Sequence, residues 1–491
     1  MTSLKHRTVS GFKWQVILQV TTKVLSVGTF AILARILDPS VFGLFALAFV
    51  AIDGLSLFKA FGIDAGIIQR KDTNDTIKNT AFWMVTISGT SVFLFCFILA
   101  PFAADFFRNH DAASVIRALG IIFVVNGFGK IPSALLTRDM KFKTISIIQL
   151  IGGIVNSICA IGFALISPSI WSLVLAYLAK TVVMDVLSWY HSGFRLRFAF
   201  DGKVAREFLS FGSILMAGGL VGYITENINN IAVGRLLGTT KVGYMALANN
   251  VASFINTHFT YLILRVLFPA YSSIQDDKPE LQRVYLKILK YISLFTIPFC
   301  LALAILSREL VLTLYGEKWH MIIPIMQVAA FIQLFASIVS GAGPLYMACG
   351  RPKYALHLAL AGLAVRIPLV IFMTQTWGLM GTILSDLFTN MLLAPLSILL
   401  VRKTIAFSWA DFWKALKPSL LCSGLMSAVI IGFKLLANLP FLNFFASYPF
   451  ALLLACTIVG CITYGAAIIL FDKSSYKEVK DLIFRLGKGA V

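Results

Sequence analysis

Apolar runs of about 20 residues recur along nearly the whole chain, and short polar or charged segments separate them. A helix of that length crosses the hydrocarbon core of a bilayer. The pattern therefore predicts an all-α, polytopic membrane protein with fourteen transmembrane helices. The predicted spans are 14–34, 41–68, 80–100, 113–135, 145–167, 170–190, 208–237, 241–269, 287–306, 321–347, 354–374, 377–401, 415–437 and 448–471.

The chain also contains an internal repeat. Residues Phe30–Ala48 (FAILARILDPSVFGLFALA) and Asn230–Ala248 (NIAVGRLLGTTKVGYMALA) align without a gap. Each copy reads as a helix, a polar turn and a second helix, which is the outer corner of a hydrophobic hairpin. Six positions are identical in the two copies: Arg35/Arg235, Leu37/Leu237, Gly43/Gly243, Ala46/Ala246, Leu47/Leu247 and Ala48/Ala248.

The repeat continues beyond this corner, where Gly129, Pro132 and Lys141 match residues 341, 344 and 353 at a constant offset. Spans 1–6 therefore correspond to spans 7–12. Because six is an even number, both copies run in the same direction, as two parallel six-helix lobes. The predicted parts are an N-lobe (1–190), a cytoplasmic linker (191–207), a C-lobe (208–401), and two further helices with a cytoplasmic tail (402–491).

Composition and charge support a membrane protein. The chain is 58% hydrophobic and 13% charged, and its mean hydropathy is +0.86. The net charge is +20, but 28 of the 42 lysines and arginines fall on one set of alternate loops and seven on the other. This asymmetry follows the positive-inside rule and predicts that both termini are cytoplasmic. The basic charge therefore reports topology, and nucleic-acid binding is not expected.

Four segments resemble a known family. The chain resembles the Wzx-type polysaccharide exporters of the MOP superfamily, and within them the colanic-acid exporter branch. The resemblance covers roughly residues 5–470. It is carried by the ordered set Leu37–Ala48 (LDPSVFGLFALA), Leu135–Lys143 (LLTRDMKFK), Leu267–Asp276 (LFPAYSSIQD) and Gly316–Trp319 (GEKW).

The resemblance implies a flippase for undecaprenyl-diphosphate-linked oligosaccharide repeat units in the bacterial cytoplasmic (inner) membrane. Such a protein works by alternating access and serves the assembly of exopolysaccharide, capsule or lipopolysaccharide O-antigen. Its partners would be the lipid-linked oligosaccharide, membrane lipids and a polysaccharide polymerase or chain-length complex. No cofactor or metal is expected, and a proton or sodium gradient would reset the carrier.

Two other functions stay open. One is a cation-coupled multidrug exporter of the same superfamily, although cationic side chains within the spans disfavour cationic substrates. The other is a membrane enzyme such as a glycan polymerase. No HExxH, GxSxG or P-loop motif is present, so the sequence predicts a transporter rather than an enzyme.

Polar residues inside the spans give the candidate site. Charged side chains at mid-bilayer are costly, so they usually face a cavity or a partner. The polar residues form stripes on spans 1, 2, 7 and 8, which are related in pairs by the repeat. We therefore expect them to line a hydrophilic path. The candidates for diphosphate or glycan binding are Gln19, Lys23, Lys59, Asn249, Asn256 and Arg265.

Each basic candidate has a simpler interpretation. Lys23 and Asp53 both fall near mid-bilayer, and the two could form an ion pair that joins spans 1 and 2. Lys59 could extend to the cytoplasmic headgroups, and Arg265 could serve only topology. If the cavity opens to the cytoplasm, however, Lys59 and Arg265 would meet an anionic headgroup early.

The acidic residues are candidates for ion coupling. Glu226 stands beside a run of amides and could bind a proton or a sodium ion, with Asp53 and Asn230 as further candidates. Pairing of Glu226 with Lys23 or another cation is the alternative. Arg366 and Asp386 are predicted to pair structurally, and Lys180 and Asp185 are weaker candidates for the path.

Overall fold

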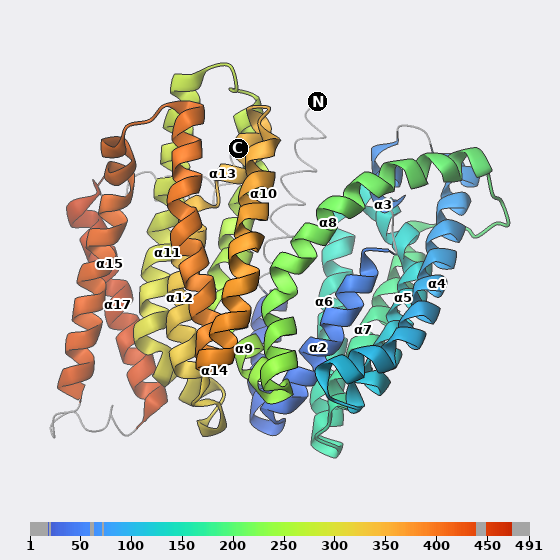
Figure 1. The fold of residues 1–491 in the computed structure, drawn as a ribbon, viewed down its shortest axis with the longest axis horizontal. Helices are drawn as coiled ribbons and strands as arrows, with labels where there is room; N and C mark the ends of the chain where they lie inside the picture. The colour runs from blue at the N-terminus through green and yellow to red at the C-terminus, as the bar shows by residue number, and fades with distance from the viewer. Residues whose placement is uncertain (1–17, 19–20, 59–62, 71–72, 438–447, 474–491) are drawn as a thin grey trace. The chain divides into compact units, whose positions relative to one another are not determined.

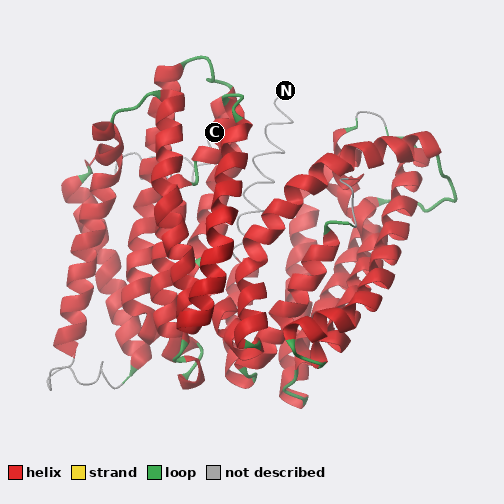
Figure 2. Ribbon diagram, viewed as in Figure 1, coloured by secondary structure: helices red, strands yellow, loops and turns green. Residues whose placement is uncertain are grey.

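The computed structural model describes residues 18, 21–58, 63–70, 73–437 and 448–473, without the side chains of residues 65, 69, 209–218, 258, 259, 261, 262, 265 and 266. Every regular element in these ranges is a helix (Figure 2). Ten of the described helices are long and apolar enough to cross a membrane. The predicted all-α, polytopic fold is thus confirmed, whereas the count of fourteen spans stays a prediction.

The chain divides into two compact units, Met1–Gly243 and Tyr244–Val491. In the first unit, α4 and α5 pack side by side, and α7 packs against both α5 and α6 (Figure 1). The described helices of this unit are residues 21–36, α2 (Pro39–Ser56), α3 (Ile63–Gln69), α4 (Asp75–Phe107), α5 (Asp111–Arg138), α6 (Phe142–Ile166), α7 (Ile170–Ser192), α8 (Gly202–Leu237) and the start of α9 (Thr239–Ala252).

Local signals in the sequence explain where these helices begin and end. Asn74 caps α4, because its side-chain oxygen accepts a hydrogen bond from the backbone N–H of Ile77 at 2.8 Å. Asp201 caps α8 in the same way, with Lys203 N–H as the donor at 2.8 Å. α7 ends at Gly193, whose φ of +67° is readily adopted by glycine alone.

The repeated glycines Gly43 and Gly243 lie against each other. A Cβ atom at Gly43 would overlap the carbonyl group of Thr239 and lie 2.8 Å from the Gly243 nitrogen. A Cβ atom at Gly243 would likewise overlap the Pro39 carbonyl and lie 3.1 Å from the Gly43 nitrogen. The two contacts mirror each other across the repeat. The first turns of α2 and α9 therefore touch backbone to backbone, which only glycine allows.

The segment between α7 and α8 is fastened to the first turns of α4. Backbone N–H groups of Arg197 and Asp201 donate to Asn79 Oδ1 at 2.7 Å and Thr80 Oγ1 at 2.9 Å. Trp83 Nε1 donates to the Arg197 carbonyl at 3.2 Å, and its ring stacks on Phe198. These hydrogen bonds satisfy backbone groups that would otherwise be unpaired. The segment predicted as a linker is therefore ordered on the surface of α4.

The second unit contains two breaks in its apolar segments. A π-helix, η1 (Asn256–Thr260), precedes α10 (Tyr261–Ser272), and residues 340 and 341 separate α12 from α13. The other elements are α11 (Lys278–Leu314), η2 (Glu317–Trp319), α12 (Ile322–Val339), α13 (Ala342–Ala348), α14 (Pro352–Ile405), α15 (Trp409–Ala437) and α17 (Pro449–Phe471).

α14 is a helical hairpin that contains two of the predicted spans. Its backbone breaks at Gly378, where φ is +60° and ψ is −142°. Arg366 Nε and Asp386 Oδ1 lie 2.7 Å apart across this break. In a straight helix, 20 residues would separate them by about 30 Å. The hydroxyl groups of Thr374 and Thr382 also meet at 2.8 Å. The predicted spans 354–374 and 377–401 are therefore two antiparallel segments.

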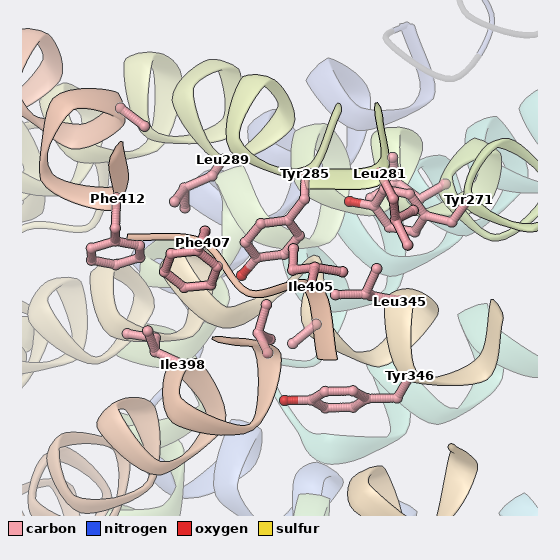
Figure 3. Close-up of a cluster of buried hydrophobic side chains, with 14 of the residues drawn as sticks. Tyr271, Leu281, Tyr285, Leu289, Leu345, Tyr346, Ile398, Ile405, Phe407 and Phe412 are labelled. Atoms are coloured by element: carbon pink, nitrogen blue, oxygen red, sulfur yellow. The ribbon is translucent and has the colours of Figure 1, made fainter. Parts of the chain in front are cut away.

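An aromatic core fixes one end of the second unit (Figure 3). The ring of Phe407 stacks on Tyr285 of α11 and on Phe412 of α15, with centroids 6.2 and 6.0 Å apart. Tyr346 of α13 is buried nearby and donates its hydroxyl hydrogen to the Ser397 carbonyl at 2.9 Å. This cluster joins five helices, α10, α11, α13, α14 and α15, around one buried core.

Large apolar side chains are exposed along several of the described helices. Ile166 of α6 is 83% exposed, Phe372 of α14 is 64% exposed and Ile462 of α17 is 67% exposed. A water-soluble protein rarely exposes so much apolar surface along its helices, whereas hydrocarbon solvates it without cost. The arrangement is that of a protein whose outer faces meet lipid.

Candidate functional site

Three of the predicted site residues lie in the first unit with exposed side chains. Lys23 stands on the helix at 21–36, Asp53 on α2 and Glu226 on α8. Asn230, one turn beyond Glu226, is partly buried. Gln19, Lys59 and the side chain of Arg265 lie outside the described residues.

The packing of α8 on α2 brings the two acids together. Tyr223 of α8 donates its hydroxyl hydrogen to the Val50 carbonyl at 3.0 Å. Its ring lies over Gly54, where a Cβ atom would come within 2.9 Å of the hydroxyl oxygen. Glu226 is one helical turn beyond Tyr223, and Asp53 is next to Gly54. The carboxyl groups of Asp53 and Glu226 are close enough to interact electrostatically.

Two lysines form the basic part of this region. The ammonium group of Lys180 on α7 lies 5.5 Å from the ring centre of Tyr177 and interacts electrostatically with Lys23. The helix that carries Lys23 is held to α6, because Thr29 Oγ1 donates to Ser157 Oγ at 2.7 Å. Tyr177 in turn is within electrostatic range of Asp53. We call Lys23, Asp53, Lys180 and Glu226 the charged cluster of the first unit.

The members of the charged cluster do not neutralise one another by contact. Among the ion pairs that the described residues form, none includes Lys23, Asp53 or Glu226. The predicted alternative of a Lys23–Asp53 ion pair is therefore not formed in this structure. Asp53 interacts electrostatically with Glu226, and Lys180 with Lys23. Such a site can accept an anion at the lysines and a cation at the carboxylates.

The predicted polar residues of the second unit include one with a clear structural role. Asn256 lies in the π-helix η1 and donates to the Gln333 carbonyl at 2.9 Å and to Gln333 Oε1 at 2.8 Å. Its own Oδ1 accepts from Thr260 at 3.1 Å. Asn256 thus joins η1 to α12. Asn249 of α9 is partly buried, and glycan binding by either residue stays a prediction.

The structure adds residues that the sequence analysis missed or ranked low. Tyr177 and Tyr223 border the charged cluster, and Lys180 belongs to it. Lys180 follows Tyr177 by one helical turn on an apolar span, a spacing that places both on one face. This spacing is the sequence signal that could have identified Lys180 as a site residue. The predicted Arg366–Asp386 pair is confirmed at 2.7 Å.

Comparison with known proteins identifies the family. Residues 32–324, more than half of the chain, match the family described as "Polysaccharide biosynthesis protein". The chain belongs to this family. Its sequence is 29% identical over 441 residues to the lipopolysaccharide biosynthesis protein WzxC of Escherichia coli, covering 88% of this chain and 89% of that protein. The predicted membership among Wzx-type proteins is confirmed, whereas the colanic-acid branch is not separately shown.

Further relatives and solved structures agree with this assignment. The succinoglycan biosynthesis transport protein ExoT of Rhizobium meliloti is 24% identical, covering 96% of this chain and 94% of that protein. The fold is similar to the lipid II flippase MurJ in an inward closed conformation, with a TM-score of 0.75, 18% identity and coverage of 94% and 99%. A multidrug resistance MATE transporter of the MOP superfamily matches with a TM-score of 0.62, 15% identity and coverage of 78% and 94%. At these identities the structures show the fold.

Proposed function

We propose that this protein flips undecaprenyl-diphosphate-linked oligosaccharide repeat units from the cytoplasmic to the periplasmic leaflet of a bacterial inner membrane, by alternating access. Family membership supports the class of process. The names of relatives, which include a lipopolysaccharide biosynthesis protein and a succinoglycan transport protein, support a lipid-linked glycan as the cargo. The precise sugar is left open.

The observation that carries this proposal is the electrostatic interaction of Lys180 with Lys23 within a bundle of apolar helices. Two neighbouring ammonium groups repel each other, and the cost is greater where water is scarce. A dianionic diphosphate would relieve this repulsion with charge-assisted hydrogen bonds. Lys23 is exposed and makes no ion pair among the described residues, so it is available for this role.

The carboxylates of the cluster supply the proposed coupling site. Asp53 and Glu226 are exposed and interact electrostatically, so a proton or a sodium ion bound between them would relieve their mutual repulsion. The cargo and the coupling ion would then bind to helices of the same unit. Binding of the ion at the carboxylates changes the electrostatic environment of the lysines, and this couples ion binding to cargo binding.

The test is a flipping assay with the purified protein in liposomes, using a fluorescent undecaprenyl-diphosphate oligosaccharide. We expect Lys23→Gln and Lys180→Gln each to reduce the flipping rate at least tenfold, with unchanged protein abundance. Lys203→Gln, an exposed lysine outside the cluster, serves as the control and should retain the wild-type rate. Wild-type rates in both cluster variants would refute the proposed anion site.

A cation-coupled multidrug exporter is the second candidate, because exposed carboxylates such as Asp53 and Glu226 also attract organic cations. The same liposomes distinguish the two functions. Transport of a cationic dye without movement of the lipid-linked glycan would favour the exporter. A membrane glycan polymerase would instead lengthen the glycan in the assay, which a mass measurement of the product detects.

Orientation and partners complete the proposal. The loop charges support a topology with both termini in the cytoplasm. A polymerase or chain-length complex would receive the flipped repeat units on the other side of the membrane. These expectations rest on charge distribution and on the proposed cargo.

A further inference from the structure

A pocket with three lysines opens between α11 and α15 of the second unit. Its volume is about 250 Å³. Its lining residues are Leu286, Lys287, Lys290, Tyr291, Lys414 and Ala415. The proposed flipping reaction uses none of them. We call this site the lysine pocket.

The fold brings these lysines together from two helices. Lys287, Lys290 and Tyr291 follow each other at spacings of three and four residues, so they share one face of α11. α15 is fixed against α11 at the same level by the aromatic core of Tyr285, Phe407 and Phe412, seen in Figure 3. One turn deeper, the hydroxyl groups of Ser293 and Ser419 meet at 2.9 Å and hold the same two helices.

The pocket is basic and preorganised. Its lining residues include three ammonium groups and no carboxylate. Lys290 is oriented by Asp472 at the end of α17, with Nζ and Oδ2 2.8 Å apart. The Lys287 ammonium group lies 5.8 Å from the ring centre of Tyr291. Lys287 and Lys414 have exposed side chains. An anion entering the pocket would meet the oriented ammonium group of Lys290 and the exposed ammonium groups of Lys287 and Lys414.

The surface beside the lysine pocket is apolar. Phe295 follows Tyr291 by one turn on α11 and is 42% exposed, and Leu421 follows Lys414 by two turns on α15 and is 52% exposed. Trp413, next to Lys414, is 57% exposed, and tryptophan is enriched at the level of lipid headgroups. Along α11, Lys287 and Lys290 are followed by the ring of Tyr291 and then by Phe295, which is the order in which a phospholipid arranges phosphate, glycerol and acyl chains.

We propose that the lysine pocket binds the phosphate group of an anionic phospholipid, with the acyl chains lying along Phe295 and Leu421. Basic pockets between transmembrane helices on the cytoplasmic side suit such headgroups. The loop charges predict that this end of α11 and α15 is cytoplasmic. The bound phospholipid is distinct from the transported cargo. It would hold the ends of α11 and α15 at the membrane surface.

The test uses the full-length protein in detergent micelles, with lipid adducts counted by native mass spectrometry during titration. The probe is dioleoylphosphatidylglycerol, and dioleoylphosphatidylcholine is the neutral comparison. The variant is Lys287→Gln with Lys414→Gln. The matched control, Lys203→Gln with Lys353→Gln, removes the same charge from exposed sites elsewhere on the predicted cytoplasmic side. Each variant's melting temperature is measured to confirm that it is folded.

We expect wild type and control to bind phosphatidylglycerol equally and in preference to phosphatidylcholine. The pocket variant should bind phosphatidylglycerol about 25-fold more weakly, since each of the two lysines near the phosphate contributes about fivefold. Equal weakening in both double variants would show a diffuse surface-charge effect and overturn the proposal. An unchanged affinity in the pocket variant would also overturn it.

Competition with inorganic phosphate distinguishes a phospholipid headgroup from a free anion as the ligand of the lysine pocket. If a phospholipid is the ligand, millimolar inorganic phosphate should leave phosphatidylglycerol binding unchanged, because it lacks the acyl chains that Phe295 and Leu421 contact. Replacement of Leu421 by Asn should weaken lipid binding as well. Full displacement of the lipid by inorganic phosphate would refute a lipid site and assign the pocket to a free anion.

Discussion

At the scale of single residues, the charges inside the apolar helices behave in two ways. Arg366 and Asp386 form a close ion pair, as their sequence positions on consecutive predicted spans indicated. Lys23 and Asp53 do not pair, although both were expected at the same depth. A sequence gives the depth of a residue along its helix, but not which neighbouring helix its side chain faces. The contacts of α8 with α2 decide that Asp53 lies beside Glu226.

The buried Arg366–Asp386 pair gives a stability prediction. Both residues lie within apolar helices, and the Asp386 side chain is 11% exposed. Arg366→Gln leaves a buried carboxylate without its cation, which costs about 3–5 kcal/mol. We expect a lower melting temperature in detergent for this single variant, and a partial recovery for Arg366→Gln combined with Asp386→Asn. If the double variant is as unstable as the sum of the two single variants, the pair is not coupled.

At the scale of helices, most boundaries were predictable and several irregularities within the segments were not. Apolar length placed α5, α6, α7 and α17 within a few residues of the predicted spans, whereas α4, α11 and α15 extend further, by roughly one to three turns. The π-helix η1 and the division of the segment 41–68 into α2 and α3 had no counterpart among the predicted spans. The turn inside α14 did, because the predicted spans 354–374 and 377–401 separate only a few residues before Gly378.

The crossing of α2 and α9 gives a prediction at this scale. An alanine at Gly243 would place its Cβ atom onto the Pro39 carbonyl group, so the two helices must move apart. We expect Gly243→Ala to lower the melting temperature and the yield of folded protein. Gly424→Ala on α15 is the matched control, because nothing lies within 4 Å of its added Cβ atom. For Gly424→Ala we expect an unchanged or slightly higher melting temperature, since alanine favours the helix more than glycine does. Equal melting temperatures and yields for the two variants would contradict a close contact between α2 and α9.

At the scale of the whole molecule, the repeat and the distribution of basic loops predict two lobes and cytoplasmic termini. Composition and periodicity were sufficient for an all-α membrane protein, and the four family segments were sufficient for its family. The candidate site was only partly predictable. Lys23, Asp53 and Glu226 stood out as rare charges in apolar spans, but their grouping with Lys180 depends on tertiary packing. The lobe boundaries and the number of spans stay predictions.

Membrane topology can be measured directly. Fusions of green fluorescent protein and alkaline phosphatase after residue 473 and after residue 317 report opposite sides of the membrane. The loop charges predict fluorescence without phosphatase activity after residue 473, and the reverse after residue 317. The same result at both positions would contradict the predicted span count between them.

The contact between Gly43 and Gly243 has a consequence for the evolution of this protein. When a chain is built from two copies of one unit, most positions face different surroundings in each copy and can drift independently. Here a residue faces its own counterpart, so one steric limit applies to both copies simultaneously. Variation among natural sequences should therefore be small at both glycines together, while the neighbouring corner residues are free to differ.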